Sequence, residues 1–486
     1  MNARFRTGMG RLLWAAAFCA IASVANADLP RGVGRAFLDA GIPLNRVALY
    51  VQDVDKLQPL FAYDADRPMN PASTMKLVTT LAALELLGPD YRWRTEAYLD
   101  GRLRNGALDG DLILKGYGDP KITVEQWQAF MNTLVSQGLL TIKGDLVLDR
   151  SAFALPPHDP GAFDGEPLKP YNVGPDALLV SFKSVDVSFA PDFSSNVARI
   201  KVDPPLAALS VPATLPLRSG DCGDFRLAIA PSYNDDGRSA HVAFHGGYPA
   251  SCGERDWWIA LLDHPAYVHS MFTAYFNAAG GRFDGALKEA RAPRSAKPFA
   301  VLESPPLYDI VRDVNKLSNN VMARQIFLTL ALAKSAAPAT PDKAAGVVRA
   351  WLKQQKLVLP GLNMENGSGL SRHERISARG LARLLLAADH SPVRDEFASS
   401  LAVAAMDGTV QRRFVDGTVA GQALLKTGSL EGVRALAGYV IGAGGRRFVV
   451  VAIINHPNAA RGAPALDYLV QWVYQNAATW DRGQQH

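Results

Sequence analysis

A long stretch of β-strand character lies between two segments that carry helices, and this order constrains the fold more than any other feature. From Tyr91 to about residue 300, short runs rich in β-branched and aromatic residues alternate with clusters of Gly, Pro, Asp and Asn. Residues 73–87 before this stretch show the apolar spacing of a helix, and helical spacing returns after Leu307. The pattern predicts one α/β domain whose sequence is interrupted by a large β-rich insertion.

The flanking segments contain the expected strands and helices of that domain. Residues 46–52 and 59–63 predict one hairpin, and residues 433–441 and 448–454 predict another, with Gly444-Gly445 as its turn. Apolar spacing predicts helices at residues 73–87, 313–333, 343–355, 376–388 and 465–474, and inside the insertion at residues 124–140 and 267–277. The predicted divisions are a signal peptide (1–27), the first part of the domain (28–92), the insertion (93–304) and the second part (305–486).

The first 27 residues have the three parts of a secretory signal peptide. Three arginines precede the apolar residues 12–24, and Ala25-Asn26-Ala27 supplies small residues at a cleavage site. The apolar run is short for a membrane span, so we expect cleavage before Asp28 and no transmembrane anchor in the mature chain. The expected location is therefore the periplasm.

Cleavage would change both the charge and the cysteine count. The whole chain has 51 Lys and Arg against 46 Asp and Glu, a net charge of +5, and loss of three arginines leaves 48 against 46, or +2. No block rich in Lys and Arg remains, so nucleic acid is not an expected partner. Cys222 and Cys252 are then the only cysteines, and an even pair in an exported chain predicts a disulfide.

Three short strings carry the chemistry, and they occur in order along the chain: Ser73-Thr74-Met75-Lys76, Ser318-Asn319-Asn320 and Lys426-Thr427-Gly428. The same set, in the forms SxxK, SDN and KTG, is typical of class A β-lactamases and penicillin-binding proteins. Each string alone is common by chance. Together, with the first opening a predicted helix and the last opening a predicted strand, they are specific.

The spacing of Ser73 and Lys76 fits nucleophilic catalysis. A serine hydroxyl is a weak nucleophile at neutral pH and needs an adjacent base. Residues three apart on a helix share one face, so Lys76 can reach the Ser73 hydroxyl, and burial or a nearby cation would lower the lysine pKa enough for it to act as a base. The backbone N–H of Ser73 can also help to hold an oxyanion. The alternative is that Ser73 simply caps the helix.

Ser318 and Asn320 lie where a polar stretch meets the apolar helix of residues 321–332. A hydroxyl at this place can pass a proton to a leaving amine, and an amide can bind the backbone of a substrate. Both residues are therefore predicted to be catalytic. The alternative is a loop serine and an asparagine that cap the helix.

The third string has the groups that bind a terminal carboxylate. Lys426 supplies fixed positive charge, and Thr427 and Ser429 supply hydroxyl donors. Gly428 lets a substrate chain lie close to the strand edge, in the manner of strand addition. The alternative for Lys426 is an exposed lysine on a strand.

With these motifs the chain resembles the class C low-molecular-mass penicillin-binding proteins, a family of D-alanyl-D-alanine carboxypeptidases and endopeptidases. Further strings support the resemblance along most of the chain: NPASTMKLVTT (70–80), GYGDP (116–120), GDLVLD (144–149), GSGLSR (367–372) and MDGT (406–409). The resemblance implies an antiparallel sheet flanked by helices, with extra domains inserted after the nucleophile helix. It also implies peptidoglycan peptides and β-lactams as partners, no cofactor, and the roles given above for Ser73, Lys76, Ser318 and Lys426. The second string departs from the family pattern, since Asn319 stands where Asp is expected.

Other enzyme classes fit less well. A serine β-lactamase would share the acylation apparatus but has no evident use for the large insertion, and a catalytically silent wall-binding protein would not need all four catalytic side chains. His241 and His245 can share one face of a strand, as in a zinc carboxypeptidase, but no HExxH string or carboxylate cluster accompanies them, so no metal site is expected. No G-x-S-x-G string occurs, which disfavours an α/β-hydrolase. The motifs leave open the oligomeric state and the balance between removing a terminal D-alanine and cutting cross-links.

Overall fold

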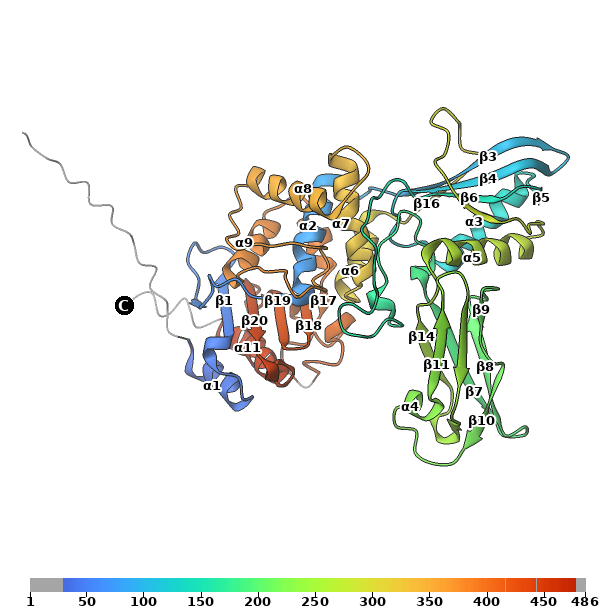
Figure 1. Ribbon diagram of the computed structural model, residues 1–486. Coiled ribbons are helices and arrows are strands. Elements are labelled where there is room, and N and C mark those ends of the chain that lie inside the picture. Colours follow the sequence, from blue (N-terminus) through green and yellow to red (C-terminus); the bar gives the residue numbers. More distant parts are fainter. Residues whose placement is uncertain (1–28, 416, 443, 478–486) are drawn as a thin grey trace, which may run out of the picture.

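A computed structural model describes residues 29–415, 417–442 and 444–477, so the predicted signal peptide lies outside the described residues. A six-stranded sheet forms the centre of one domain, in the order β17-β18-β19-β20-β1-β2, and all neighbouring strands are antiparallel (Figure 1). The strands are β1 (Val47–Asp53), β2 (Phe61–Tyr63), β17 (Ala402–Val403), β18 (Ala423–Leu430), β19 (Val433–Ile441) and β20 (Arg447–Asn455). Both predicted hairpins are confirmed.

Helices cover the two faces of this sheet, and alternate strand residues point to each. In β1, Val47, Leu49 and Val51 pack with α1 (Arg31–Asp39) and α11 (Ala463–Asn476). Ala48 and Tyr50 face the larger helical layer on the opposite side. That layer contains α2 (Lys76–Leu87), α6 (Leu307–Lys316), α7 (Asn320–Lys334), α8 (Pro341–Gln354), α9 (Ala378–Asp389) and α10 (Arg394–Ser399). We call the sheet with these helices the central domain.

Helix α2 is surrounded by protein and carries the first motif. Its residues 76–84 are all buried, and it contacts α6, α7, α8 and α9. A helix that is apolar on all sides is expected in the core of a domain, because it has no polar face to leave in water. Lys76, the first residue of this helix, therefore lies in the interior of the domain.

The insertion leaves and re-enters the central domain at adjacent points. Its first strand β3 pairs antiparallel with its last strand β16, so that Arg94 lies opposite Glu303. These strands belong to a sheet in the order β15-β6-β4-β3-β16, with β5 beside β4, and α3 and α5 pack with it. The elements are β3 (Arg94–Arg104), β4 (Ala107–Gly116), α3 (Val124–Ser136), β5 (Thr141–Ile142), β6 (Leu146–Asp149), α5 (His264–Ala278), β15 (Leu287–Glu289) and β16 (Ala300–Glu303).

The rest of the insertion forms an extended arm, residues 185–259, that projects from this sheet (Figure 1). Its two small sheets have the orders β13-β10-β8-β7-β14 and β11-β12-β9. A disulfide joins Cys222 to Cys252 in the arm, as predicted. The elements are β7 (Val185–Asp192), β8 (Val197–Asp203), β9 (Leu209–Ser210), β10 (Thr214–Arg218), α4 (Phe225–Ile229), β11 (Pro231–Asp235), β12 (Ala240–Phe244), β13 (Tyr248–Pro249) and β14 (Arg255–Ile259).

Two expectations from the sequence need correction, and the structure contains one helix that no expectation covered. The segment predicted as one helix over residues 313–333 is two helices, because α6 ends at Lys316 and α7 begins at Asn320. The third motif does not open a strand, since Lys426 is the fourth residue of β18. Helix α1 was not predicted at all. The apolar face of α1 is short, so its pattern in the sequence is weak. This face is buried because it packs against α11, which lies more than 400 residues away in the chain.

A buried glutamine connects the insertion to the central domain. Gln325 of α7 accepts a hydrogen bond from the backbone N–H of Asp176 at 3.0 Å and donates one to the Asp176 carbonyl at 2.7 Å. Its side chain is wholly buried. Both backbone groups of Asp176 depend on this side chain, because water cannot reach them.

Gln325→Leu should therefore lower the stability of the whole chain. The leucine fills a similar volume but leaves two buried backbone groups without partners, so we expect the free energy of unfolding to fall by about 1–3 kcal/mol. The midpoint of urea unfolding measures this change, and Gln128→Leu on the exposed face of α3 is the matched control. Equal midpoints for the two variants would contradict the role assigned to Gln325.

Candidate active site

The first motif begins in a tight turn and ends in a buried helix. Ser73 lies in a 3-10 turn, Ala72–Met75, and Lys76 is the first residue of α2. The Lys76 Nζ is 2.9 Å from the Ser73 Oγ, as the spacing of the two residues predicts. Ser73 does not act as a side-chain cap, because no side chain caps α2.

The amino group of Lys76 has two further acceptors. Its Nζ donates to the Asn320 Oδ1 at 2.6 Å and to the Ser368 carbonyl at 2.6 Å. A neutral amine has two N–H groups and one lone pair. With both N–H groups held by Asn320 and Ser368, the lone pair of a neutral Lys76 would face the Ser73 hydroxyl, which is the geometry that a general base needs.

The surroundings of Lys76 favour its neutral form. Its side chain is wholly buried, and burial lowers the pKa of Lys76 well below the ordinary lysine value. The nearby cation of Lys426 lowers that pKa further, while the carboxylate of Glu374 opposes the shift. The structure thus supplies both causes of a lowered pKa that the sequence analysis required.

The second motif occupies the break between α6 and α7. Ser318 has a φ of 59°, in the left-handed region, and Asn320 begins α7. Asn319, between them, caps α7 by accepting a hydrogen bond from the Met322 N–H at 3.0 Å. The capping role that was the alternative for Ser318 and Asn320 therefore belongs to Asn319, which leaves the other two side chains turned toward the lysines.

Lys426 joins the third motif to the second. Its Nζ donates to the Ser318 Oγ at 2.7 Å and to the carbonyl of Thr427 at 2.8 Å. The side chain is wholly buried, and burial lowers the pKa of Lys426 to about 7. The positive charge is therefore not fixed, as the sequence analysis assumed, and Lys426 is not an exposed strand lysine either.

The remaining residues of the third motif surround the serine. The Thr427 Oγ1 donates to the Thr409 Oγ1 at 2.8 Å, while Ser429 is exposed. A Cβ on Gly428 would lie 2.6 Å from the Pro71 carbonyl oxygen and 3.1 Å from the Ser73 nitrogen. Only glycine allows β18 to approach the turn of Ser73 so closely.

Several residues that the sequence analysis gave no role hold this arrangement. The Oε1 of Glu374 accepts hydrogen bonds from the N–H groups of residues 365, 366 and 367 at 2.9–3.0 Å, next to the carbonyl of Ser368 that binds Lys76. Glu374 is wholly buried and its pKa is raised by that burial. The GSGLSR string marked this loop but did not indicate that Glu374, two residues after it, would order the loop.

The asparagines Asn70 and Asn455 fix the turn before Ser73. The Asn70 Oδ1 accepts from the Ala72 N–H at 2.9 Å, and its amide donates to the Ser371 carbonyl at 2.9 Å. Asn455 of β20 pairs with both backbone groups of Asn70 at 2.8 and 3.0 Å. The turn that contains Ser73 is thus tied to the sheet and to the GSGLSR loop.

A loop of the insertion, residues 155–173, approaches the site, and we call it the covering loop. The Asn320 amide lies 3.4 Å from the Tyr171 carbonyl, and Arg324 donates to the Val173 carbonyl at 3.1 Å. The guanidinium of Arg372 lies over the ring of Phe163, 4.6 Å from its centre. The insertion therefore forms one wall of the site, although its sequence contains none of the three motifs.

The two histidines considered as zinc ligands, His241 and His245, lie on the arm and not among the three motifs. His241 is on β12, and His245 follows it and is 2.7 Å from the Ser232 hydroxyl. Across residues 29–415, 417–442 and 444–477, no three His, Cys, Asp or Glu side chains gather to hold a metal ion. No helix in this described part is long and apolar enough to cross a membrane.

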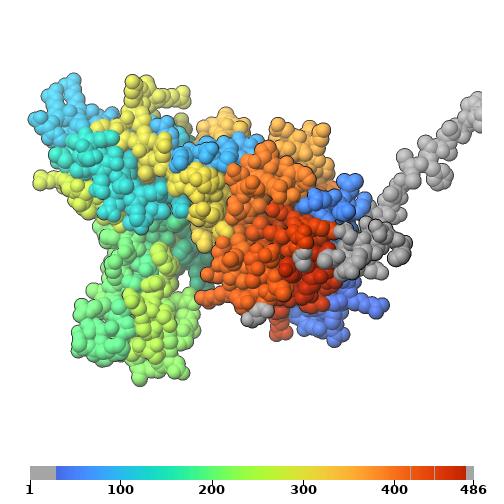
Figure 2. All heavy atoms as spheres, turned by 180° about the vertical axis from the view of Figure 1, so that it is seen from behind, coloured from blue at the N-terminus to red at the C-terminus, as the bar shows by residue number. Residues whose placement is uncertain are grey.

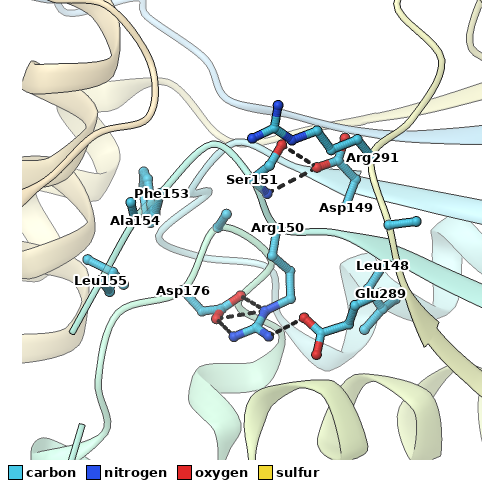
Figure 3. A pocket seen from close by; sticks show the side chains of 12 residues that line it. Leu148, Asp149, Arg150, Ser151, Phe153, Ala154, Leu155, Asp176, Glu289 and Arg291 are labelled. Atoms are coloured by element: carbon cyan, nitrogen blue, oxygen red, sulfur yellow. Dashed lines mark hydrogen bonds and ion pairs between the residues drawn. The ribbon is translucent and has the colours of Figure 1, made fainter. Parts of the chain in front are cut away.

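A cavity of about 450 Å³ in the insertion contains none of the motif residues (Figure 3). Arg150 projects into it and pairs with Asp176 and with Glu289, whose Oε2 is 2.7 Å from the Arg150 Nη1. Asp149 accepts a hydrogen bond from the Ser151 hydroxyl at 2.6 Å. Because Arg150 is paired with the protein's own carboxylates, its role in this cavity is structural.

Glu374 gives a direct test of how the pKa of Lys76 is set. Glu374→Gln keeps an oxygen for the three N–H groups but removes the charge, which lowers the pKa of Lys76 further. Labelling of Ser73 by a fluorescent penicillin should then begin to rise at lower pH than in the parent chain. Glu374→Ala removes the oxygen as well, so labelling should fall at every pH by about tenfold or more. If the labelling of Glu374→Gln began to rise at the same pH as in the parent chain, Glu374 would order the loop without affecting the pKa of Lys76.

Comparisons with known proteins agree with this geometry. A model of the D-Ala-D-Ala carboxypeptidase 3 (S13) family matches residues 32–475. The D-alanyl-D-alanine carboxypeptidase DacB of Haemophilus influenzae is 25% identical over 421 residues, which are 85% of each chain. A D-alanyl-D-alanine carboxypeptidase of Actinomadura is 27% identical over 443 residues, which are 84% of this chain and 77% of that protein.

Solved structures have the same fold. Penicillin binding protein 4 of Haemophilus influenzae superposes with a TM-score of 0.75 at 23% identity, covering 90% of this chain and 99% of that one. A predatory peptidoglycan endopeptidase of Bdellovibrio bacteriovorus superposes with a TM-score of 0.51 at 16% identity, covering 88% of this chain and 92% of that one. The resemblance and the fold class predicted from the sequence are both confirmed. The family model extends over most of the chain, and the chain accordingly belongs to the D-Ala-D-Ala carboxypeptidase 3 (S13) family.

Proposed function

We propose that this enzyme is a serine D-Ala-D-Ala carboxypeptidase that acts on peptidoglycan stem peptides through an acyl-enzyme on Ser73. The observation that carries the proposal is the buried amino group of Lys76, 2.9 Å from the Ser73 hydroxyl and held by Asn320 and Ser368 on its other sides. A lysine with a lowered pKa in this position can take the hydroxyl proton as the serine attacks.

The acylation step follows from these positions. The Ser73 Oγ attacks the carbonyl carbon of the D-Ala–D-Ala bond, and its proton passes to the Lys76 Nζ. The carbon–nitrogen bond then breaks, and the leaving amine takes a proton from the Ser318 hydroxyl, which is restored from Lys426 at 2.7 Å. The proton gained by Lys76 is then exchanged through solvent for the one lost by Lys426, which restores both lysines. Water attacks the ester and gives a proton to Lys76, the bond from the carbonyl carbon to the Ser73 Oγ breaks, and Lys76 passes that proton to the Ser73 Oγ as the shortened peptide leaves with a new carboxyl group.

Lys426 also has the position of a receptor for the substrate carboxylate. Thr427, Thr409 and Ser429 bring hydroxyl groups to the same end of β18. β17 pairs only with Leu424 and Leu425 of this strand, so it does not cover the edge beyond Leu425. A peptide could add to that edge with its terminal carboxylate at Lys426.

Cross-linked peptides present a similar bond to the same serine, so a DD-endopeptidase activity is part of the proposal. The Bdellovibrio relative is described as a peptidoglycan endopeptidase, and the Haemophilus relative was solved in complex with a β-lactam. A β-lactam would acylate Ser73 through the same steps, because its carboxylate and reactive carbonyl resemble those of the peptide. A periplasmic location, reached through the signal peptide of residues 1–27, fits a substrate in the cell wall.

We further propose that the catalytic domain consists of residues 28–92 and 305–486, with residues 93–304 as the insertion. The pairing of Arg94 with Glu303 supports these boundaries, since the chain leaves and returns at one place. The six strands of the central sheet come from outside this interval.

Variants of the first motif test the assignment. Ser73→Ala should abolish covalent labelling by a fluorescent penicillin and turnover of diacetyl-Lys-D-Ala-D-Ala, while the thermal unfolding curve stays close to that of the parent. Lys76→Ala keeps the hydroxyl but removes the base, so acylation should slow by about 10²–10⁴-fold. Normal labelling of Ser73→Ala would refute the proposal. Rapid release of the penicillin product by the parent chain would instead identify a β-lactamase.

The lowered pKa of Lys426 predicts the alkaline side of the pH profile. Below about pH 7, Lys426 of the free enzyme is protonated and can bind a carboxylate. Above this pH it is increasingly neutral, so its attraction for a carboxylate is lost. The value of kcat/KM for a peptide with a free terminal carboxylate should therefore fall above about pH 7. Lys426→Arg stays protonated at these pH values, so this decline should disappear even if the rate is lower.

An amidated peptide is the control for this prediction. It has no carboxylate, so Lys426→Met should slow it much less than it slows the free acid, for which we expect a loss of roughly ten- to hundredfold. If Lys426→Met slowed both peptides equally, Lys426 would act only on the proton of Ser318 and not on the substrate carboxylate.

A further inference from the structure

A second cavity, of about 510 Å³, lies on the arm, and three separate segments line it. Residues 223–226 form the first wall at the start of α4, and residues 255–258 of β14 form the second. Lys169 of the covering loop forms the third. None of these residues belongs to the three motifs, and the proposed reaction does not use them.

Covalent and hydrogen bonds hold the walls together. The disulfide joins Cys222, just before the first wall, to Cys252, just before the second. The Ser251 hydroxyl also donates to the Gly220 carbonyl at 2.8 Å, and the Ala260 N–H donates to the Leu168 carbonyl at 2.9 Å beside the third wall. A cavity braced in this way exists before any ligand binds, which is typical of binding sites.

The cavity combines an exposed aromatic ring with charged groups of both signs. Trp258 is 55% exposed, whereas Trp257, on the opposite face of β14, is half-buried and packs with Phe225 in the core of the arm. The charged lining groups are three cations and two carboxylates: Lys169, Arg226, Arg255, Asp224 and Asp256. Arg226 pairs with Asp224 at 2.7 Å, and no carboxylate lies within ion-pair distance of Lys169 or Arg255 in the described part of the chain. An exposed indole beside charged groups offers both an apolar face and polar partners to a ligand.

The cavity is connected to the active site through the covering loop. Lys169 lies two residues before Tyr171, whose carbonyl is 3.4 Å from the amide of Asn320. Figure 1 shows β14 and α4 on the side of the arm that faces the central domain, and Figure 2 shows a notch between the two. The cavity and the candidate active site therefore share the covering loop.

We propose that this cavity binds the glycan strand of peptidoglycan while one of its stem peptides is cleaved at Ser73. A pyranose ring has an apolar C–H face that can pack on Trp258, and its hydroxyl and acetamido groups can pair with both the cations and the carboxylates of the rim. A purely anionic peptide would leave Asp224 and Asp256 facing like charge. The proposal rests on the proposed function, because it names the polymer to which the substrate peptide is attached.

Sedimentation with purified insoluble peptidoglycan tests the proposal on the full mature chain. Trp258→Ala should weaken binding by about tenfold or more, since truncation of a central tryptophan typically has this effect. Phe193→Ala is the matched control, because Phe193 is a 74% exposed aromatic residue elsewhere on the arm, between β7 and β8. Equal binding of the parent and Trp258→Ala would overturn the proposal.

Two further measurements separate this proposal from the proposed function. Turnover of diacetyl-Lys-D-Ala-D-Ala by Trp258→Ala should equal that of the parent, since this peptide has no sugar. A parallel loss of turnover would show that Trp258 supports the active site instead of binding glycan. If the parent itself failed to cleave the peptide but bound peptidoglycan through Trp258, only the proposed function would fail.

The identity of the ligand is tested with a peptide-free sugar. A tetramer of N-acetylglucosamine should perturb the tryptophan fluorescence of the parent and of Phe193→Ala, but this response should be lost in Trp258→Ala. It should also compete with insoluble peptidoglycan in the sedimentation assay. Competition by a soluble stem peptide without any effect of the sugar would assign the cavity to peptide and contradict the glycan proposal.

Discussion

The active site depends on one buried amino group. Lys76 has three hydrogen-bond partners, and they come from three parts of the chain: Ser73 in the adjacent turn, Asn320 at the start of α7 and Ser368 in the GSGLSR loop. A buried amine without partners is strongly unfavourable, so all three segments must be in place together. Asn70, Glu374 and Gly428 hold those segments in place, so the position of Lys76 depends on residues beyond its direct partners.

Both lysines of the site are wholly buried, and this burial opposes stability while serving the chemistry. Burial lowers the pKa of each, and the charge of Lys426 adds to the shift at Lys76. In the proposed mechanism the easily deprotonated Lys76 accepts the Ser73 proton, and a substrate carboxylate bound beside Lys426 would raise the pKa of Lys426 again. Sites of this kind trade stability for function, since the missing counter-charge is supplied by the ligand.

The insertion gives the site its surroundings without contributing a motif. Its covering loop reaches Asn320 and Arg324. Gln325 of α7 binds the backbone of Asp176, which follows this loop, and so holds the insertion against the central domain. The arm adds a braced cavity that is lined in part by Lys169 of the covering loop. A substrate attached to a polymer has contacts to make far from the scissile bond, and a rigid extension next to the site can provide them.

The sequence by itself determined the parts of this protein that depend on local spacing. The three-residue interval from Ser73 to Lys76, the alternation in the strands and the even pair of cysteines each predicted a correct feature, because each follows from short-range geometry or simple counting. Only the tertiary structure decided the break at Ser318, the capping role of Asn319 and the partnership of Lys426 with Ser318. It also decided that Lys426 loses its fixed charge and that Glu374 orders the loop behind Lys76. The burial of the lysines and the contact of Lys426 with Ser318, 108 positions apart, arise only when segments pack. The Asn319 cap and the Glu374 loop are short-range, but several local conformations are open to such residues, and packing selects one of them.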